Sequence, residues 1–481
     1  MRSCIYILCL ISIQLSAQTG IIWEEPIMIT DGLTGYNHPR IVLDSDENPV
    51  VIWGDDEDAH LSRKAGLYFT APQMLDPMGM SIFTASWAGP DITSKGDTIY
   101  VVFKENPEDA APVYCITSYD GGETFSAPVI VDGMIGENVS RFPSVTVDAD
   151  GNPLVAFMKL DADFLNAEYV VAKSDDYGNS FNMDVMASGF SGGEVCDCCP
   201  VGITSNDNFV TTLYRDNLDN LRNSWAGISS DGGNTFNMGL QIDQTDWTVF
   251  ACPASGPDGI IINDNLYSVF MSAGEGDSRV YFSTSSLTEL TDEPDKRVSA
   301  EIEGLSIQNY PRIASYGNAV AIVWKQVANA NSVIPISFTN DISSGFPLDY
   351  DTVANLDFYG LENADVSVSS NKVHVVWQDD YNNAVMYREG LYVTPVIVDQ
   401  IFVENDIKIF PNPTGSFINL NSKNEISSSI LYDIHNKQVK NIINGGKTTF
   451  SIPVNELTSG IYFLKLIDIN GKTHTEKVIV E

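Results

Sequence analysis

Short apolar segments with alternating polar positions recur through the first 400 residues at a nearly constant spacing. Each begins at a proline or its equivalent, as in His38-Pro39-Arg40-Ile41-Val42 and Phe142-Pro143-Ser144-Val145. Alternation with a period of two, bounded by Gly, Asn and Asp, is typical of β-strands and not of helices. The seven starts, at positions 39, 90, 143, 200, 253, 311 and 364, are 51, 53, 57, 53, 58 and 53 residues apart.

Each start is followed by a second apolar strand, for example Val50-Val51-Ile52-Trp53 or Ala321-Ile322-Val323-Trp324. Two further strands then flank a turn, so each repeat supplies four strands, the content of one propeller blade. The pattern predicts an all-β propeller over residues 18–400, with seven blades favoured over six. Residues 21–29 have the pattern of a fourth strand, and we expect them to complete the last blade and remove an open edge.

One turn recurs in phase with the strands. Ser118-Tyr119-Asp120-Gly121-Gly122-Glu123-Thr124-Phe125 returns as residues 174–181 and 229–236, which are 56 and 55 residues further on. The motif resembles the Asp box, Ser-x-Asp-x-Gly-x-Thr-aromatic, of sialidase-like propellers. We expect the aspartate to accept bonds from turn amides and the aromatic ring to pack between sheets. The resemblance implies a sialidase-like β-propeller, with these turns serving folding away from the ligand face.

The two ends of the chain carry export signals. Arg2, an apolar run from Ile5 to Leu15 and the small residue Ala17 predict a cleaved signal peptide over residues 1–17. No later segment approaches the roughly 20 apolar residues of a membrane helix, so no transmembrane segment is expected.

After residue 404 the pattern changes. Pro-Asn-Pro at 411–413 and Ser-Gly-Ile-Tyr at 459–462 resemble the type A sorting domain of the type IX secretion system. The resemblance implies a small β-sandwich over residues 404–481 and the type IX machinery as a partner. It also implies secretion across the outer membrane, followed by release or by anchoring at the cell surface.

The chain is strongly acidic, with 64 acidic against 26 basic residues and a net charge of −38. Such a field repels nucleic acid and anionic membrane surfaces, so no nucleic-acid partner is expected. We interpret the charge as a solvated exterior, with calcium binding as the weaker alternative.

Against this background, a few basic residues stand at the inner strands of the predicted propeller. A guanidinium binds a carboxylate through two parallel hydrogen bonds, so arginines clustered at a channel predict a glycan or other anionic ligand. The alternative for each arginine is a salt bridge within an acidic protein. The candidates are Arg40, Arg141 and Arg312 beside the strand starts, with Arg215 and Arg222 further along the fourth repeat.

The resemblance to sialidases implies further roles at that site. Those enzymes use three arginines, a Tyr/Glu nucleophile pair and an aspartic acid/base. Tyr310, Glu194 and Asp55 are candidates for the last three roles. The family's Arg-Ile-Pro motif is matched only loosely, by Arg141-Phe142-Pro143, and in the third repeat instead of the first.

Cysteines cluster in Glu194-Val195-Cys196-Asp197-Cys198-Cys199-Pro200. Cys199 and Cys252 both precede a repeat proline, so a Cys199–Cys252 disulfide is favoured in an oxidising compartment. The alternative is a thiolate site for zinc or copper that uses Cys196, Cys198, Cys199, Cys252 and His38. Adjacent Cys198 and Cys199 cannot easily both join unstrained bridges, which keeps this alternative open. Cys115 stands in a predicted third strand, and we expect its side chain to be buried as part of the core packing.

Three functions remain open from the sequence. The first is a glycoside hydrolase of exo-sialidase type acting on an anionic glycan. The second is a non-catalytic module that binds a glycan or peptide, and the third is a metal or redox site at the cysteines. The fold does not decide among them, because propellers carry many functions.

Overall fold

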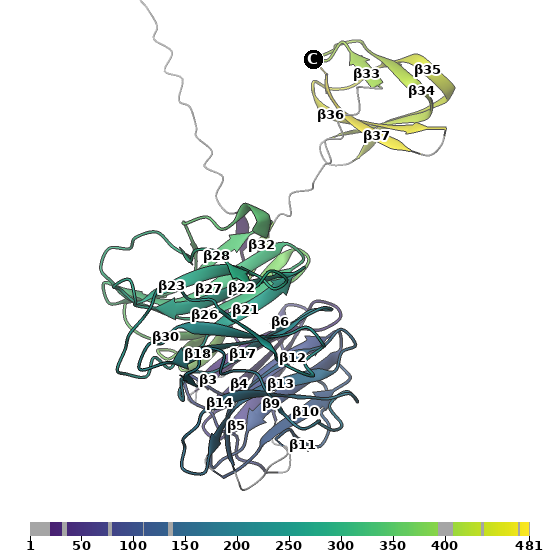
Figure 1. Cartoon of the computed structure of the whole chain (residues 1–481). Coiled ribbons are helices and arrows are strands. Elements are labelled where there is room, and N and C mark those ends of the chain that lie inside the picture. Colours follow the sequence, from purple (N-terminus) through teal and green to yellow (C-terminus); the bar gives the residue numbers. More distant parts are fainter. Residues whose placement is uncertain are drawn as a thin grey trace, which may run out of the picture. The chain divides into compact units, whose positions relative to one another are not determined.

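The computed structural model divides into two compact units, Met1–Thr394 and Pro395–Glu481 (Figure 1). The predicted signal peptide lies outside the described residues. Those residues are 20–30, 36–75, 79–108, 110–132, 138–392, 407–433, 437–469 and 472–480.

The first unit contains seven antiparallel sheets of four or five strands within the described ranges. The first sheet holds β3 (Tyr36–Leu43), β4 (Pro49–Asp55), β5 (Asp58–Ala65), β6 (Tyr68–Phe69) and β7 (Gln73–Met74). The second holds β8 (Asp91–Lys95), β9 (Thr98–Lys104), β10 (Val113–Ser118) and β11 (Val129–Ile130), and the third holds β12 (Asn138–Val147), β13 (Pro153–Asp161), β14 (Glu168–Lys173) and β15 (Val185–Met186). The fourth holds β16 (Glu194–Val195), β17 (Gly202–Ser205), β18 (Val210–Asn217), β19 (Ser224–Ser229) and β20 (Met238–Gln241).

The remaining sheets follow the same plan. The fifth holds β21 (Asp258–Ile262), β22 (Asn265–Ser272), β23 (Arg279–Ser286), β24 (Thr291–Asp292) and β25 (Lys296–Arg297). The sixth holds β26 (Leu305–Tyr316), β27 (Ala319–Ala328), β28 (Asn331–Thr339) and β29 (Asp351–Leu356), with the 3-10 helix η1 (Ile342–Ser344) between the last two. The seventh holds β30 (Leu361–Val368), β31 (Lys372–Asp379) and β32 (Ala384–Tyr392), joined by β1 (Ile21–Trp23) and β2 (Ile27–Met28).

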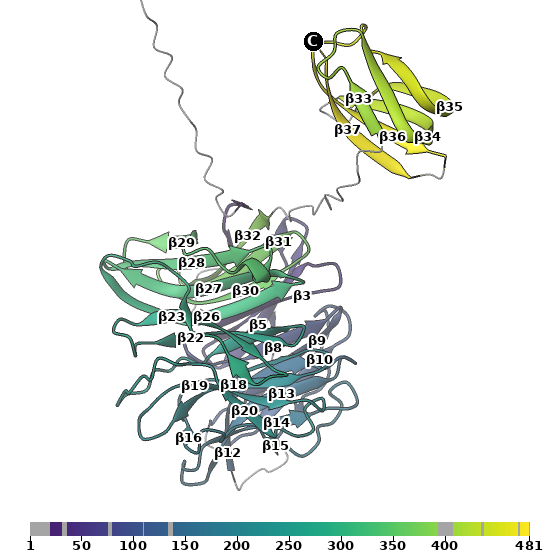
Figure 2. The same cartoon turned by 45° about the horizontal axis from the view of Figure 1, so that its top comes forward.

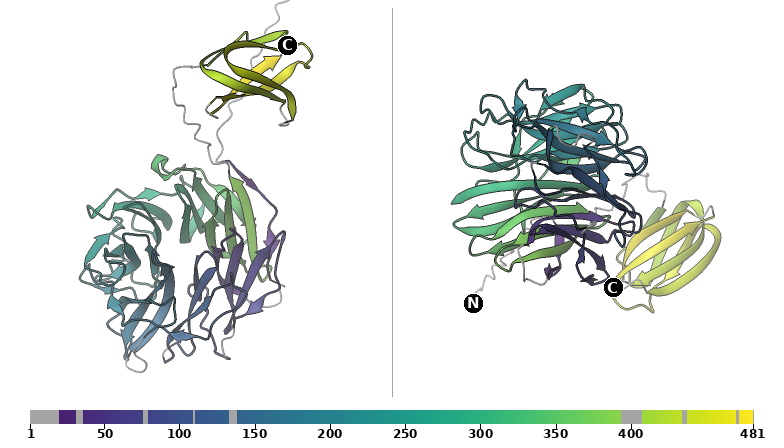
Figure 3. Two further views of the ribbon diagram at one scale, coloured as in Figure 1. Left: turned by 90° about the vertical axis from the view of Figure 1, so that its right-hand side faces the viewer. Right: turned by 90° about the horizontal axis from the view of Figure 1, so that it is seen from below.

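The inner strands of successive sheets contact one another in a closed ring. The order is β3, β8, β12, β17, β21, β26 and β30, and β30 contacts β3 again. The sheets therefore stack against one another (Figure 2) and surround a central axis as the blades of a β-propeller (Figure 3, left). β1 and β2 pair with β32, and Ile22 lies opposite Leu391. The predicted closing strand at the N-terminus is thereby confirmed.

The second strand of each sheet is buried on both faces because a neighbouring sheet covers each face. In β4, Val50 and Ile52 pack into the core shared with the second sheet, and Val51 and Trp53 pack into the core shared with the seventh. All four side chains are fully buried. Burying one such side chain stabilises the fold by roughly 1.5–3 kcal/mol. The alternating side chains of one strand thus fill the hydrophobic cores on both of its faces.

The three repeated turns join the third and fourth main strands of the second, third and fourth sheets. Asp120 accepts hydrogen bonds from the Thr124 amide (2.9 Å), the Thr124 hydroxyl (2.6 Å) and the Ser118 hydroxyl (2.8 Å). Asp176 and Asp231 make the same bonds. Partial burial raises the pKa of Asp120, but these hydrogen bonds outweigh it and lower that pKa to about 2. The aromatic residues that end the turns pack in the cores between adjacent sheets: Phe125, Phe181 and Phe236.

A turn with the same spacing of key residues, but with different hydrogen bonds, follows β28 and was not predicted from the sequence. Thr339, Asp341 and Phe346 keep the spacing of the first, third and last positions of the other three turns. Asp341 accepts hydrogen bonds from the amide (3.1 Å) and the hydroxyl (2.8 Å) of Ser343. Phe346 packs edge-on against Phe282 of the fifth sheet, with ring centroids 5.1 Å apart.

The fifth repeat does not begin where the proline pattern placed it. β21 begins at Asp258, after Pro257, and Cys252-Pro253-Ala254 lies in the long connection that precedes it. The predicted start at Pro253 was wrong because the connection before β21 contains two prolines, Pro253 and Pro257. Cys252 is therefore not the counterpart of Cys199.

The second unit is a small β structure. Its strands are β33 (Ile407–Phe410), β34 (Phe417–Asp433), β35 (Gln438–Pro453), β36 (Gly460–Asp468) and β37 (Thr473–Val480). β34 pairs with β35 along most of its length, and on its other edge with β33 near its start and β36 near its end. Ile418, Leu464 and Val478 are fully buried in its core. Within the described part of the chain, no helix is long and apolar enough to cross a membrane.

Candidate functional site

Four inner strands contain the same unusual backbone conformation. The residue before the proline position has a positive φ at His38 (54°), Phe142 (52°), Tyr310 (50°) and Asn363 (45°). The strand register shifts at the same four points. A bulge of this kind re-aims a side chain, and the conformation costs roughly 1–3 kcal/mol at a non-glycine residue. The repeated bulge turns these four side chains into the central channel, where all four line cavities.

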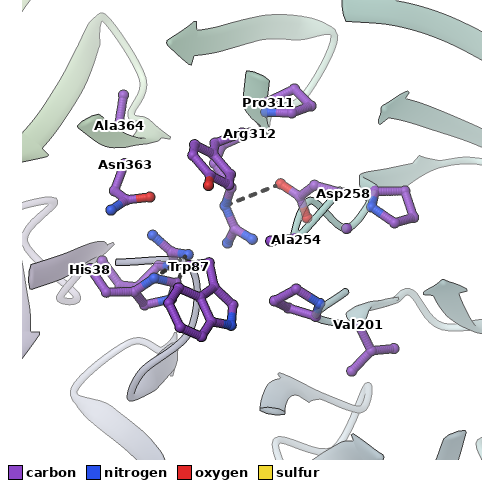
Figure 4. Close-up of a pocket in the computed structure, with 14 residues that line it drawn as sticks. His38, Trp87, Val201, Ala254, Asp258, Pro311, Arg312, Asn363 and Ala364 are labelled. Carbon is purple, nitrogen blue, oxygen red and sulfur yellow. Dashed lines mark hydrogen bonds and ion pairs between the residues drawn. The ribbon is translucent and has the colours of Figure 1, made fainter. Parts of the chain in front are cut away.

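One cavity lies in the central channel, where several inner strands converge (Figure 4). The cavity has a volume of about 50 Å³, which holds a few water molecules. A sugar ring could therefore engage only the mouth of this cavity. The lining residues are His38, Arg40, Trp87, Pro200, Val201, Ala254, Gly256, Pro257, Asp258, Tyr310, Pro311, Arg312, Asn363 and Ala364.

Arg40 and His38 form one side of the cavity. The guanidinium of Arg40 donates to Nε2 of His38 (2.6 Å) and to the carbonyl of Pro39 (2.8 Å). Burial and the neighbouring Arg312 lower the pKa of Arg40 to about 10. Burial, Arg40 and Arg312 lower the pKa of His38 well below its ordinary value. His38 is therefore a neutral imidazole that accepts a hydrogen bond.

Arg312 occupies the centre of the cavity (Figure 4). Its Nε lies 3.0 Å from Asp365 Oδ1 and 3.4 Å from Asp258 Oδ2. Burial disfavours the charge of Arg312, but Asp258, Asp365 and Asp91 outweigh burial and raise its pKa. Its two terminal nitrogens make no hydrogen bond to any described residue. Arg312 thus keeps a fixed charge with a free pair of donors.

The three channel aspartates also connect neighbouring sheets. Each inner-strand carboxylate accepts a hydrogen bond at 3.0 Å from a backbone amide of a neighbouring inner strand. The pairs are Asp91 with Val145, Asp258 with Ile313 and Asp365 with Ile41. Burial raises the pKa of Asp258, although Arg312 opposes that shift. The arginines of the channel are therefore balanced by carboxylates with a structural role.

Two aromatic residues border the cavity. Trp87 is 39% exposed although it is a large apolar side chain, and it lies beside His38 in the cavity lining (Figure 4). Sequence reasoning missed Trp87, although it stands three residues before a repeat proline. Tyr310 is half-buried, burial raises its pKa to about 12, and Lys325 lies 6.0 Å from its ring centroid.

Arg141, Arg215 and Arg222 do not line the cavity. Arg141 forms two hydrogen bonds of 2.7 Å with Glu108. Arg215 is fully buried and donates to the carbonyls of Ser255, Arg222 and Met271. Arg141 and Arg215 are therefore engaged in contacts within the protein, and the structure does not bring them to the cavity.

The predicted acid/base candidates also lie away from the cavity. Asp55 is at the end of β4, opposite Asp58. Glu194 is exposed at the start of β16, opposite Asn217. Neither residue lines the channel cavities, because both stand outside the bulges that turn side chains inward.

The cysteine loop has a different pairing from the one predicted. The disulfide joins Cys198 to Cys252, and Cys199 stays a thiol beside Cys196. The Cys199–Cys252 pairing is therefore wrong, because Cys252 lies in the connection before β21 and not at a strand start. His38 is not part of this group: among the described residues, the ligand atoms that cluster here belong to Cys196, Cys198 and Cys199. Cys115 is a buried thiol, as predicted.

The two thiols have opposite electrostatic environments. Arg222 donates a hydrogen bond of 3.0 Å to Cys196 Sγ, and Cys199 Sγ lies 3.0 Å from the same sulfur. The hydrogen bond with Cys199 lowers the pKa of Cys196 to about 6, helped by Arg222 and against the effect of burial. Burial, followed by the interaction with Cys196, raises the pKa of Cys199 well above its ordinary value. Cys196 is therefore the more acidic thiol of the pair.

Residues 408–481 match the family of secretion system C-terminal sorting domains. The match confirms the predicted sorting domain and indicates type IX secretion to the cell surface or the extracellular space. The fold and the tail together define an exported β-propeller protein. No curated protein matches the chain significantly.

Several solved structures have a similar fold. A PL25 ulvan lyase bound to a glucuronic acid–sulfated rhamnose saccharide is 10% identical, over 77% of this chain and 96% of that chain (TM-score 0.48). The α-L-arabinanase of Penicillium chrysogenum with arabinobiose is 13% identical, over 63% and 92% (TM-score 0.41). The endosialidase of phage phi92 is 11% identical, over 96% and 79% (TM-score 0.44). At these identities the likeness concerns the fold alone.

Proposed function

We propose that the propeller binds an acidic glycan outside the cell, at the mouth of its central channel. The observation that carries the proposal is Arg312, whose charged guanidinium faces the cavity with two unoccupied terminal nitrogens (Figure 4). Asp365 and Asp258 hold its Nε and so fix the plane of the guanidinium. A fixed fork of two donors matches the two oxygens of a sugar carboxylate.

Trp87 supplies the second element of recognition. An exposed indole beside an opening offers a flat apolar face, on which the apolar face of a sugar ring can pack. His38, which is neutral, and the Asn363 amide add polar groups at the same opening. The mouth thus combines a charged guanidinium, an aromatic ring and several hydrogen-bonding groups. This combination is typical of ligand-binding sites.

The geometry favours binding over hydrolysis. Burial raises the pKa of Tyr310 to about 12, so its hydroxyl is a weak nucleophile without an adjacent base. Glu362, the nearby carboxylate, hydrogen-bonds to Lys325 instead. Asp258 is held by Arg312 and by the Ile313 amide. No pair of free carboxylates therefore faces the opening among the described cavity residues.

Isothermal titration calorimetry on the mature full-length chain tests the proposal, with uronic-acid and sialic-acid oligosaccharides and their carboxyl-reduced counterparts as ligands. We expect binding of an acidic form and at least tenfold weaker binding of its reduced form. Arg312→Lys keeps the positive charge but removes the pair of parallel hydrogen-bond donors, and should weaken binding at least tenfold. Arg141→Ala, which removes an arginine engaged by Glu108, is the matched control and should bind as the wild type does.

A second pair of variants isolates the aromatic contact. Trp87→Ala should weaken binding, whereas Tyr68→Ala, which removes a 75% exposed aromatic on β6, should not. Mass spectrometry of the oligosaccharides after incubation reports hydrolysis. Cleaved products would replace binding by a glycosidase function, and no heat of binding with any acidic saccharide would refute the proposal.

A further inference from the structure

Four sulfur atoms gather at the loop that leads into the channel wall. Cys198 and Cys252 are bridged, and the Cys196 sulfur lies 3.5 Å from that of Cys198 and 3.0 Å from that of Cys199. One sulfur, that of Cys196, is thus close to the bridge and to the free thiol at once. Pro200, the next residue, lines the cavity.

The surroundings of Cys196 favour a sulfur anion. Arg222 is only 9% exposed, and its guanidinium donates a hydrogen bond of 3.0 Å to Cys196 Sγ. Its Nε has no hydrogen-bond partner in the described structure, so the guanidinium is not fully paired. A thiolate is the attacking species in thiol–disulfide exchange, and an adjacent arginine stabilises it.

The four cysteines differ in how far they are exposed to solvent. Cys252 is exposed and Cys198 is half-buried, whereas Cys196 and Cys199 are fully buried. A reagent from solution therefore reaches the bridged pair before it reaches the free pair. The buried thiolate, in turn, can reach only its sulfur neighbours.

We propose that these four cysteines form a disulfide-exchange centre, in which one disulfide migrates between the outer pair Cys198–Cys252 and the buried pair Cys196–Cys199. The proposal goes beyond glycan binding and does not depend on it. Because Cys198 and Cys199 are adjacent, unstrained bridges on both at once are disfavoured, which fits one mobile bridge.

The exchange proceeds in two balanced steps. In the first, the Cys196 thiolate attacks Cys198 Sγ; the Cys196–Cys198 bond forms, the Cys198–Cys252 bond breaks, and Cys252 leaves as a thiolate that takes a proton from water. In the second, Cys199 gives up its proton and attacks Cys196 Sγ, and Cys198 leaves as a thiolate that accepts that proton. One disulfide is present before and after, so no outside oxidant or reductant is needed.

Alkylation of Cys252 measures the migration directly. The mature full-length chain is incubated with iodoacetamide without reductant, digested at low pH and analysed by mass spectrometry. Iodoacetamide can label Cys252 only while Cys252 is a free thiol. We therefore expect slow, complete labelling of Cys252 together with formation of a Cys196–Cys199 disulfide. Cys196→Ser removes the attacking sulfur and should slow Cys252 labelling at least tenfold. Cys115→Ser, a buried thiol elsewhere, is the control and should leave the rate unchanged.

Two further variants keep the test independent of folding defects. Cys199→Ser blocks only the second step, so Cys252 should still be labelled and a Cys196–Cys198 bridge should accumulate. Arg222→Gln should slow labelling, whereas Arg141→Gln should not. The proposal is overturned if both disulfides are present in every molecule, if Cys252 labelling is independent of Cys196, or if elemental analysis finds stoichiometric zinc or copper that Cys196→Ser removes.

Discussion

Asp365 on β30 accepts a hydrogen bond of 3.0 Å from the backbone amide of Ile41 on β3, across 324 positions of sequence. The other oxygen of the same carboxylate lies 3.0 Å from Arg312 Nε on β26. One buried side chain thereby joins the sixth, seventh and first sheets at the point where the ring closes. The same residue holds Arg312 in the orientation that the proposed ligand site requires.

Asp365→Ala should lower the free energy of unfolding of the propeller by about 3 kcal/mol, because the change leaves a buried amide unpaired and removes one partner of a buried ion pair. Urea unfolding followed by tryptophan fluorescence measures the effect. All seven tryptophans lie in the first unit, so the signal reports that unit alone. Asp357→Ala, at an exposed position just after β29, should change the unfolding midpoint little. Equal midpoints for the two variants would contradict the structural role of Asp365.

The repeated turns predict an acid-sensitive contribution to stability. Because the folded pKa of Asp120 is lowered to about 2, its contribution is full above the unfolded value near 4 and is lost as pH falls towards 2. At neutral pH, Asp120→Ala should destabilise the propeller by about 1 kcal/mol, since the carboxylate is exposed and screened by solvent. Asp46→Ala, another exposed aspartate, is the control. The difference between the two variants should shrink steadily between pH 4 and pH 2, and a difference that did not shrink over that range would argue against a role of the charge.

His374 should make the propeller less stable in mild acid. Burial, partly opposed by Glu389, lowers the pKa of His374 to about 4, and its ring contacts Tyr387 (2.7 Å) and Ser369 (3.1 Å). The unfolded chain binds a proton at this residue near pH 6.5 and the folded chain only near pH 4, so stability falls as pH drops through that window. Between pH 7 and pH 5 the loss from this residue is about 2 kcal/mol.

Urea midpoints at pH 7 and pH 5 test the role of His374. His374→Gln removes the titrating group, so its midpoint should change less between the two pH values than that of the wild type. His474→Gln, in the second unit, should behave as the wild type does. The same pH response in all three proteins would exclude His374 as the source.

Removal of residues 404–481 should stop export without unfolding the propeller. Residues 408–481 match the sorting-domain family, and the two units are separate compact bodies. Immunoblots of the culture medium, the cell surface and the periplasm should therefore show the truncated chain retained inside the outer membrane. Ile443→Ala, at an 86% exposed position of the second unit, is the control and should be exported. Normal export of the truncated chain would contradict the assignment.

The fold could be predicted from the sequence because the repeat is local and regular. Val50 to Trp53 alternate between two cores, and the same pattern returns in each repeat. The bonds of the repeated turns lie within eight residues, so Ser118, Asp120 and Thr124 could be paired from spacing alone. The prediction failed where a local feature was duplicated, as with the extra proline before β21.

The candidate site was only partly predictable. His38, Arg40, Tyr310 and Arg312 stand beside the repeat prolines, and the structure brings them together at one cavity. Trp87 was missed because it stands in a connection without periodicity. Arg141 also stands beside a repeat proline, but it precedes the residue that the bulge turns inward, and it meets Glu108 instead.

The sequence by itself determined most of the strands, their order, three of the repeated turns and the export tail, since the patterns that reveal them are local along the chain. Only the tertiary structure decided that Asp365 meets Ile41 and Arg312, and that Cys252 reaches Cys198. These pairings follow from ring closure and from the path of one long connection. A linear pattern fixes which residues share a strand, but the distance between two strands of different sheets is set by the packing of the whole ring.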